Sequence, residues 1–406
     1  MAEPVATPAG QQPDAEHEAP DPYAEYALYR RECPVPKITH ANGLVTHLVT
    51  RYADARDALG DPRLSKDARY GEEALARAGV STWRRDGSGF SHNMLTADPP
   101  EHTRLRRLVA AEFTPRRIES MRPRIQQVVD DLMAAFLPRG RADLVGEYAA
   151  QVPMTVIGEL LGVPAADREE FRSWSNAAVR PTGAAGKAEG MAAVNRYLAD
   201  LIAQKRAAPS DDLLSALITA QEDDRLTEAE VLGTAVLLLV AGHETTMNLI
   251  ASGILALVLH PSQLALLRRE PDRMPDAVEE FLRYEAPVDQ ATTRFAAADL
   301  VIGDAEIPAG SVVRVSLGSA NRDEAEFDGG AELDVTRQAS RHVAFGLGPH
   351  YCLGAPLARL EGLLAIGAVV RRCEQLALEV PVAQLQWRGA PFVRALVSLP
   401  VTFAPA

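Results

Sequence analysis

Apolar residues recur three or four positions apart along much of this chain, which is the spacing of one face of an α-helix. The segments with this pattern are 115–137, 153–162, 189–206, 228–259 and 355–374. Strand-like patterns are shorter and lie at 43–50, 299–303, 311–317 and 391–404. The pattern therefore predicts a mainly α-helical protein with small β-sheets, with long loops at 66–95 and 177–188.

The segment from Thr227 to His260 is the most informative of the predicted helices. It opens with a capping box between Thr227 and Glu230 and closes before Pro261. Its length would be about 50 Å at the helical rise of 1.5 Å per residue. Because it is apolar on all sides but carries a polar cluster at 242–246, it predicts a helix buried in a large protein rather than a membrane span.

Residues 23–406 contain no Gly/Ser linker, internal repeat or abrupt change of composition, so we expect one large domain. Residues 1–22 carry five prolines and several acids without an apolar run. This composition predicts a disordered tail rather than a signal peptide or a membrane anchor.

The overall composition narrows the function classes. The 406 residues are 47% hydrophobic and carry a net charge of -13, which argues against a nucleic-acid binder. The three cysteines, Cys33, Cys352 and Cys373, form no C-x-x-C pair, which excludes a disulfide framework and a cysteine-rich zinc site. We expect a monomer in a reducing cytoplasm.

One of these cysteines lies in an unusual loop, Phe345-Gly-Leu-Gly-Pro-His-Tyr-Cys-Leu-Gly354, immediately before a helical pattern. Glycines allow positive φ and a close approach of the backbone to a flat ligand. The helix that follows points its free N–H groups at the sulfur of Cys352, which favours a thiolate there. Cys33 and Cys373 lack such surroundings and are interpreted as inert thiols.

The loop pattern F-G-x-G-x-H-x-C-x-G resembles the haem-binding loop of the bacterial cytochrome P-450 family, and the resemblance extends over almost the whole chain, most closely to soluble actinobacterial class I members. It implies the cytochrome P-450 fold, in which a long central helix crosses haem b (iron protoporphyrin IX). Cys352 would be the axial thiolate, with its charge held by the backbone amides that follow. Phe345 would pack beside the sulfur, His350 would bind a haem propionate, and Gly346 and Gly354 would shape the loop.

The polar cluster of the long helix reads Ala241-Gly-His-Glu-Thr-Thr246. Burying an acid and two hydroxyls needs a reason. One account is structural, because a threonine can bond back to the carbonyl four residues earlier and bend the helix. The resemblance instead gives Ala241 and Gly242 the task of making room for dioxygen, and pairs Thr245 with Glu244 in delivering the protons that dioxygen cleavage consumes.

Further residues gain a role only through the resemblance. Glu280 and Arg283 lie three apart in a helix expected between Pro275 and Pro287, a weak signal alone because most such pairs are solvated. In the family this pair is buried and, with Arg337, fixes the cysteine loop. The cations expected to bind the haem propionates are His102, Arg106 and Arg294.

The resemblance implies a monooxygenase that inserts one atom of O2 into a substrate by hydroxylation or epoxidation. Since the chain has no G-x-G-x-x-G motif for a flavin or nicotinamide, we expect a separate ferredoxin and its NAD(P)H-dependent reductase. A docking patch could draw on the arginines at 104, 107, 116, 117, 359, 371 and 372.

The substrate pocket is expected to be apolar, which predicts a hydrophobic small molecule such as a macrolide, another polyketide or a terpenoid from antibiotic biosynthesis. Its expected lining is Met94, Leu237, Val240, Val288, Ala291 and Val393.

Three alternatives stay open at this point. A peroxide-driven haem enzyme or a non-catalytic haem or interaction module could share the fold, although the intact Glu244 and Thr245 argue against both. A thiol hydrolase using Cys352 and His350 has suitable residue types but leaves the distant motifs unexplained.

Overall fold

The structure of the chain is a computed structural model, which describes residues 21–80, 92–179, 184–222, 225–339, 341–389 and 392–406. The tail expected at 1–22 lies almost entirely outside these residues. The helices are α1 (Tyr23–Glu32), α2 (Tyr52–Gly60), α3 (Glu72–Arg77), α4 (Glu101–Ala110), α5 (Pro115–Ser120), α6 (Arg122–Phe136), α7 (Gln151–Leu160), α8 (Arg168–Val179), α9 (Ala184–Ala207), α10 (Leu213–Glu222), α11 (Glu228–Leu259), α12 (Pro261–Arg269), α13 (Met274–Tyr284), α14 (Leu317–Ala320) and α15 (Ala355–Arg372). The strands are β1 (Lys37–Thr39), β2 (Val45–Val49), β3 (Leu64–Ser65), β4 (Arg141–Asp143), β5 (Arg294–Ala296), β6 (Leu300–Ile302), β7 (Ala305–Ile307), β8 (Val312–Val315), β9 (Cys373–Leu378), β10 (Trp387–Gly389), β11 (Arg394–Leu396) and β12 (Pro400–Pro405).

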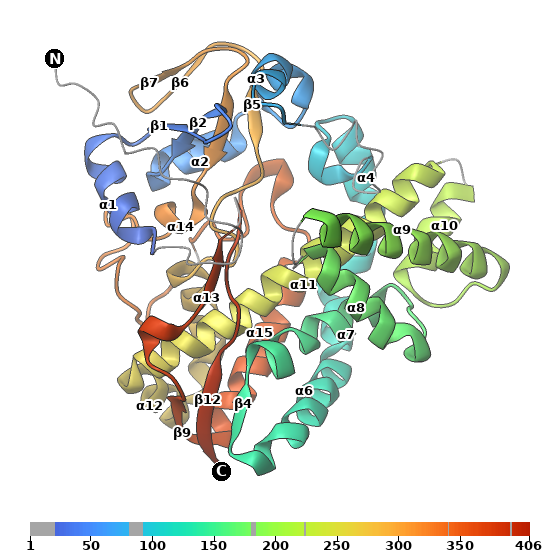
Figure 1. Cartoon of the computed structure of the whole chain (residues 1–406), viewed down its shortest axis with the longest axis vertical. Coiled ribbons are helices and arrows are strands. Elements are labelled where there is room, and N and C mark those ends of the chain that lie inside the picture. The colour runs from blue at the N-terminus through green and yellow to red at the C-terminus, as the bar shows by residue number, and fades with distance from the viewer. Residues whose placement is uncertain (1–20, 81–91, 180–183, 223–224, 340, 390–391) are drawn as a thin grey trace.

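Helix α11 runs through the middle of the molecule, where it packs against α7, α9, α13 and α15 (Figure 1). Its capping box between Thr227 and Glu230 is present, and the helix ends just before Pro261, as the sequence predicts. The helix is long and apolar enough to cross a membrane, yet 72% of its most apolar stretch is buried inside the protein. It is therefore a core helix, and its apolar surface is explained by the helices around it.

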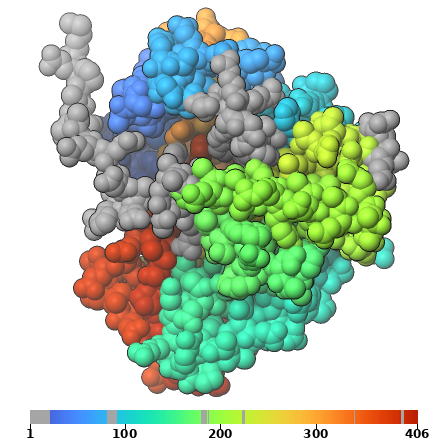
Figure 2. Space-filling model, turned by 45° about the vertical axis from the view of Figure 1, so that its right-hand side comes forward, coloured from blue at the N-terminus to red at the C-terminus, as the bar shows by residue number. Residues whose placement is uncertain are grey.

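Short strands form small sheets beside the helices. The five-stranded sheet has the order β1-β2-β8-β5-β3, in which only β2 and β8 run parallel. It lies with α2 around a second hydrophobic core, apart from the main core between the helices. The other sheets are β4-β12-β9, β10-β11 and β6-β7. Figure 2 shows α8 and α9 as a green band between the blue N-terminal part and the teal α6 and α7.

The predicted elements differ from the structure in several places. The helix expected at 115–137 is divided into α5 and α6 at Met121, and the loop expected at 66–95 contains α3. The loop expected at 177–188 is shorter, because α8 continues to Val179 and α9 begins at Ala184. Leu75 of α3 packs against Phe295 and Val312 of the five-stranded sheet, a contact between distant segments that local periodicity does not encode.

Candidate active site

The cysteine loop has the backbone that its glycines predict. Gly346 and Gly348 have φ of 71° and 72°, in the left-handed region that favours glycine. Gly354 caps α15 with an ordinary φ of -79°, so its role is not a positive φ. The Cys352 amide donates to the carbonyl oxygen of Phe345 at 2.8 Å, which closes the loop directly before α15.

The surroundings of the Cys352 sulfur shift its pKa in opposite directions. The backbone amides of Gly354 and Ala355 bond to the sulfur, and the charges of Arg106 and Arg359 lower its pKa further, but burial is the largest cause and raises the pKa above its ordinary value. The amides of the loop and of α15 therefore favour a thiolate, as the sequence predicts, but burial by the whole fold outweighs them. A metal cation held by this sulfur would supply positive charge that favours the thiolate. The residue nevertheless keeps accessible surface, so the polypeptide does not close over it completely.

Basic side chains gather beside this loop. The rings of His102 and His350 lie 4.3 Å apart, and Lys66 and Arg294 lie near enough to lower the pKa of His350. Burial, the largest cause, and these neighbours bring that pKa to about 2, while burial brings the pKa of Arg294 to about 10. Both ring nitrogens of the buried His102 lack a hydrogen-bond partner among the described residues, and so does the Nε of Arg294. Buried donors of this kind, with the charge of Arg294 among them, fit an anionic ligand with several oxygen atoms.

Lys66 is the member of this cluster that the sequence did not predict. It is 6% exposed, and its ammonium donates to the Thr292 carbonyl at 2.8 Å. Burial lowers its pKa well below the ordinary value, and Arg294 lowers it further. A single lysine in an expected loop carries no signal in the sequence, because its neighbours come from β5 and the cysteine loop. Arg106 extends the cluster by donating to the Tyr351 carbonyl at 2.7 Å.

The polar turn of α11 borders open space as well. Ala241 is exposed in the middle of an otherwise buried helix, and the Thr245 hydroxyl donates to its carbonyl at 2.7 Å. This is the back-bond of the structural account. A Cβ on Gly242 would lie 3.4 Å from Ile157, which is an ordinary van der Waals contact, so the packing of α11 against α7 does not by itself require a glycine here. Glu244 pairs with Arg388 of β10.

The buried pair expected in α13 is present. Glu280 and Arg283 are both fully buried and share two hydrogen bonds of 2.7 and 2.8 Å. Arg337 reaches Glu280 at 3.4 Å, as expected for the third partner. Arg283 also donates to three backbone carbonyls, those of Asn321, Gly330 and Glu332. The network therefore fastens the segment that leads into the cysteine loop.

A second clamp was not predicted. Glu279 accepts two hydrogen bonds from Arg359 at 2.6 and 2.9 Å and bonds to His342 at 3.1 Å. The hydrogen bonds from both partners outweigh burial and bring the pKa of Glu279 to about 2. The Arg359 guanidinium also lies 4.6 Å from the centre of the Phe345 ring. Arg359, expected in a docking patch, is thus tied to the cysteine loop.

Glu361 is another acid that the sequence analysis missed. It is 2% exposed, and burial raises its pKa to about 8 while a hydrogen bond with Thr246 of α11 opposes that rise. The sequence does contain a signal for it, because an acidic residue interrupts the apolar pattern of 355–374. Its position places a protonated acid behind the polar turn of α11.

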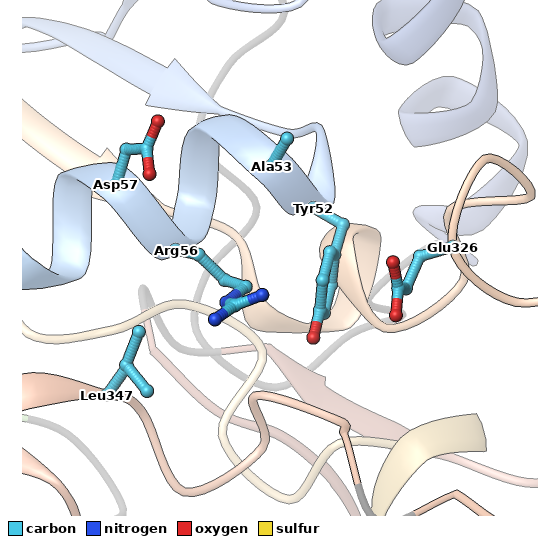
Figure 3. Close-up of a pocket in the computed structure, with 6 residues that line it drawn as sticks. All are labelled: Tyr52, Ala53, Arg56, Asp57, Glu326 and Leu347. Carbon is cyan, nitrogen blue, oxygen red and sulfur yellow. The ribbon is translucent and has the colours of Figure 1, made fainter.

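The six residues expected to line the substrate pocket fall into two groups. Val240, Val288 and Val393 are half-buried, whereas Met94, Leu237 and Ala291 are at most 9% exposed and belong to the hydrophobic cores. A separate surface cavity of about 330 Å³ lies next to the cysteine loop (Figure 3). Its lining is Tyr52, Ala53, Arg56, Asp57, Glu326 and Leu347. These mostly polar side chains do not suit a hydrophobic substrate.

Comparison with known proteins identifies the family. The cytochrome P-450 family model matches residues 179–385. The chain is 47% identical to the cytochrome P-450 monooxygenase PikC of Streptomyces venezuelae over 94% of this chain and 91% of that protein. The chain belongs to the cytochrome P-450 family.

Two further relatives agree with this assignment. The chain is 42% identical to the 6-deoxyerythronolide B hydroxylase of Saccharopolyspora erythraea, over 94% of this chain and 96% of that protein. The structure of the tirandamycin C-bound P-450 monooxygenase TamI superposes with a TM-score of 0.87 at 42% identity, over 94% of this chain and 97% of that one. The predicted fold, enzyme class and haem cofactor are thereby confirmed. This P-450 is a haem-thiolate monooxygenase, an oxidoreductase that uses redox partners and a hydrophobic substrate.

The site fits this cofactor. Haem carries two propionates, and the cluster of His102, Arg106, Arg294 and His350, with Lys66, includes buried nitrogens of His102 and Arg294 that have no hydrogen-bond partner among the described residues. The sulfur of Cys352 accepts hydrogen bonds from backbone amides, and the residue keeps accessible surface, as an axial ligand requires.

Proposed function

We propose that this P-450 hydroxylates or epoxidises a macrolide, another polyketide or a terpenoid during the biosynthesis of a secondary metabolite. The observation that carries the proposal is the similarity over nearly the whole chain to the 6-deoxyerythronolide B hydroxylase and to TamI, whose structure contains tirandamycin C. In the overall reaction NAD(P)H, a proton, O2 and the substrate become NAD(P)+, the oxygenated product and water. We further propose that the protein acts as a monomer in the cytoplasm.

The residues of this chain divide the work. Bound haem supplies dioxygen activation and oxygen insertion. Cys352 would ligate the iron, and His102, Arg106, Arg294 and His350 would hold the propionates. The remaining task is proton supply, for which Thr245 offers a hydroxyl beside the exposed Ala241. Glu244, one residue away on the same helix, would exchange protons with the surroundings.

The electron donors are proposed to be a ferredoxin and its reductase. The structure changes the expected docking patch, because Arg104, Arg117, Arg359 and Arg372 are engaged with Glu230, Glu112, Glu279 and Asp130. For Arg107, Arg116 and Arg371 no ion pair occurs among the described residues. These three carry the cationic surface that an acidic partner would contact. Charge reversal at Arg107 and Arg371 should slow electron transfer at low salt, and unchanged rates would refute the patch.

Two measurements test the proposed function. The reduced, carbon monoxide-treated protein should show the long-wavelength absorption of thiolate-ligated haem, and Cys352→Ala should lose it. Optical titration with 6-deoxyerythronolide B and tirandamycin C, followed by product analysis with surrogate ferredoxin and reductase, tests the substrate class. Failure to bind haem contradicts the enzyme class and favours the thiol hydrolase. Turnover with hydrogen peroxide but not with ferredoxin contradicts the proposed electron source.

A further inference from the structure

The hairpin of β10 and β11 meets the polar turn of α11 through one ion pair. Arg388 lies in the middle of β10 and binds Oε1 of Glu244, and the two side chains are only 19% and 15% exposed. Helix α11 also packs against β11. Because water is largely excluded from this contact, the pair is stronger than a surface pair and restricts the carboxylate to fewer rotamers.

The two faces of the hairpin are held by different partners. Residues 387 and 389 share one face with Arg394, since Gly389 pairs with Arg394 and Trp387 with Leu396. On that face the Arg394 guanidinium lies 3.6 Å from the centre of the Trp387 ring and binds Glu285 at 2.9 Å. Arg388 projects from the opposite face towards Glu244. The contact with Glu244 is therefore separate from the contact that anchors the hairpin to the end of α13.

The end of the same hairpin meets the segment after α13. The Phe392 carbonyl accepts hydrogen bonds from the amides of Asp289 at 2.9 Å and Gln290 at 3.3 Å. Val288 and Val393, both half-buried, flank this junction and are expected pocket residues. A substrate that presses on either residue would act on the hairpin that carries Arg388.

We propose that Arg388 is a positioning residue that holds Glu244 for proton delivery and links its orientation to the pocket side of the hairpin. The inference rests on the proposed function, because it assumes that Glu244 exchanges protons beside Thr245. A purely structural pair would be replaceable by apolar side chains without loss of function. The pair of Arg388 and Glu244 differs from a purely structural pair, because Glu244 is adjacent in sequence to Thr245, whose hydroxyl lies on the polar turn.

The test compares how electrons from NAD(P)H are divided. Productive turnover consumes both oxygen atoms of O2, whereas failed proton delivery releases hydrogen peroxide, formed from NAD(P)H, a proton and O2. Arg388→Met, which keeps the length and removes the charge, should raise hydrogen peroxide formed per NAD(P)H about fivefold, a fraction of the effect of removing a general acid. The dissociation constant of the titrated compound should stay within about twofold of the wild-type value, since the pair of Arg388 and Glu244 orients the acid and does not bind the substrate. Arg388→Lys should restore most of the coupling.

The matched control is Arg394→Met, which removes an arginine from the other face of the same hairpin. It should lower the thermal midpoint yet leave peroxide release close to that of the wild type. If it raises peroxide release as much as Arg388→Met does, general disruption of the hairpin explains the effect and the inference fails.

A double-mutant cycle supplies a readout independent of turnover. The changes in unfolding free energy of the haem-loaded protein caused by Arg388→Met and Glu244→Gln should be non-additive, because each removes the same pair. Additive changes overturn the inference, and so does peroxide release that Arg388→Met still raises in the Glu244→Gln background. Peroxide release is measured in the presence of whichever of 6-deoxyerythronolide B and tirandamycin C binds in the optical titration.

The outcomes separate the inference from the proposed function. If Glu244→Gln raises peroxide release and Arg388→Met does not, the role of Glu244 stands and the inference about Arg388 fails. If Glu244→Gln leaves peroxide release unchanged, the proposed role of Glu244 fails first, and the inference fails with it.

Discussion

Arg283 provides the sharpest test of how the fold supports the cysteine loop. Replacing it with methionine leaves Glu280, which is fully buried, without its main counter-charge and removes the donor from three backbone carbonyls. Removing one partner of a buried ion pair costs about 3–5 kcal/mol. The orphaned carbonyls place Arg283→Met at the upper end, about 5 kcal/mol, which is a large part of the stability of a typical domain.

Arg337 gives the matched comparison, because it reaches the same carboxylate from the edge of the network. Its contact is 3.4 Å long and its side chain is 16% exposed. Arg337→Met should therefore cost about 1 kcal/mol, as for a partly solvated pair. Arg283→Lys, which keeps the charge but only one nitrogen, should fall between the two.

The assay is urea unfolding of the haem-loaded protein, followed both by circular dichroism and by the thiolate-haem absorption. The two signals should change together for Arg337→Met, whereas Arg283→Met should lose the haem signal at a lower urea concentration than the helical signal. The reasoning is refuted if Arg283→Met lies within about 1 kcal/mol of the wild type, because a buried charge cannot then be as costly as assumed.

Three other predictions follow from buried groups. Burial raises the pKa of Glu361 from its ordinary value to about 8, so the folded state binds more protons than the unfolded state. The stability of the wild type should therefore fall as the pH rises from about 5 to 8. Glu361→Gln should flatten this slope in unfolding experiments, and an unchanged slope would contradict the assignment. Lys66→Met should speed haem loss to an apomyoglobin scavenger, whereas the same change at exposed Lys37 should not. Gly253→Ala would place a Cβ 2.8 Å from Ile366 and should lower the free energy of unfolding, measured by thermal unfolding, by about 1–3 kcal/mol. Gly60→Ala should change it little, because a Cβ there would meet no atom within 4 Å among the described residues.

Features determined within a few residues could be predicted from the sequence. The positive φ of Gly346 and Gly348, the capping box of α11 and the spacing of Glu280 and Arg283 each follow from a local pattern. The resemblance then gave these patterns a common purpose, which the comparisons confirm at the level of family and cofactor.

Contacts between distant segments could not be predicted in the same way. Arg388 and Glu244 are 144 positions apart, and Arg359 and Glu279 are 80 apart. Arg359 shows the consequence, since the sequence offers an exposed cation for docking and the fold uses it in a clamp. The pKa of Cys352 could not be predicted from its loop for the same reason. The local amides favour the thiolate, whereas burial, which depends on the whole fold, opposes it.

Helix α15 connects the two sides of the proposed haem site. Its first amides, at Gly354 and Ala355, bond to the sulfur of Cys352, and one turn later Arg359 binds Glu279. Two residues further on, Glu361 contacts Thr246 on the polar turn of α11. Residues two apart on a helix point about 200° apart, so the clamp and the buried acid face different neighbours. A displacement of α15 would therefore move the iron ligand and the surroundings of the proton-delivery turn together, and the ion pair between Arg359 and Glu279 of α13 opposes such a displacement.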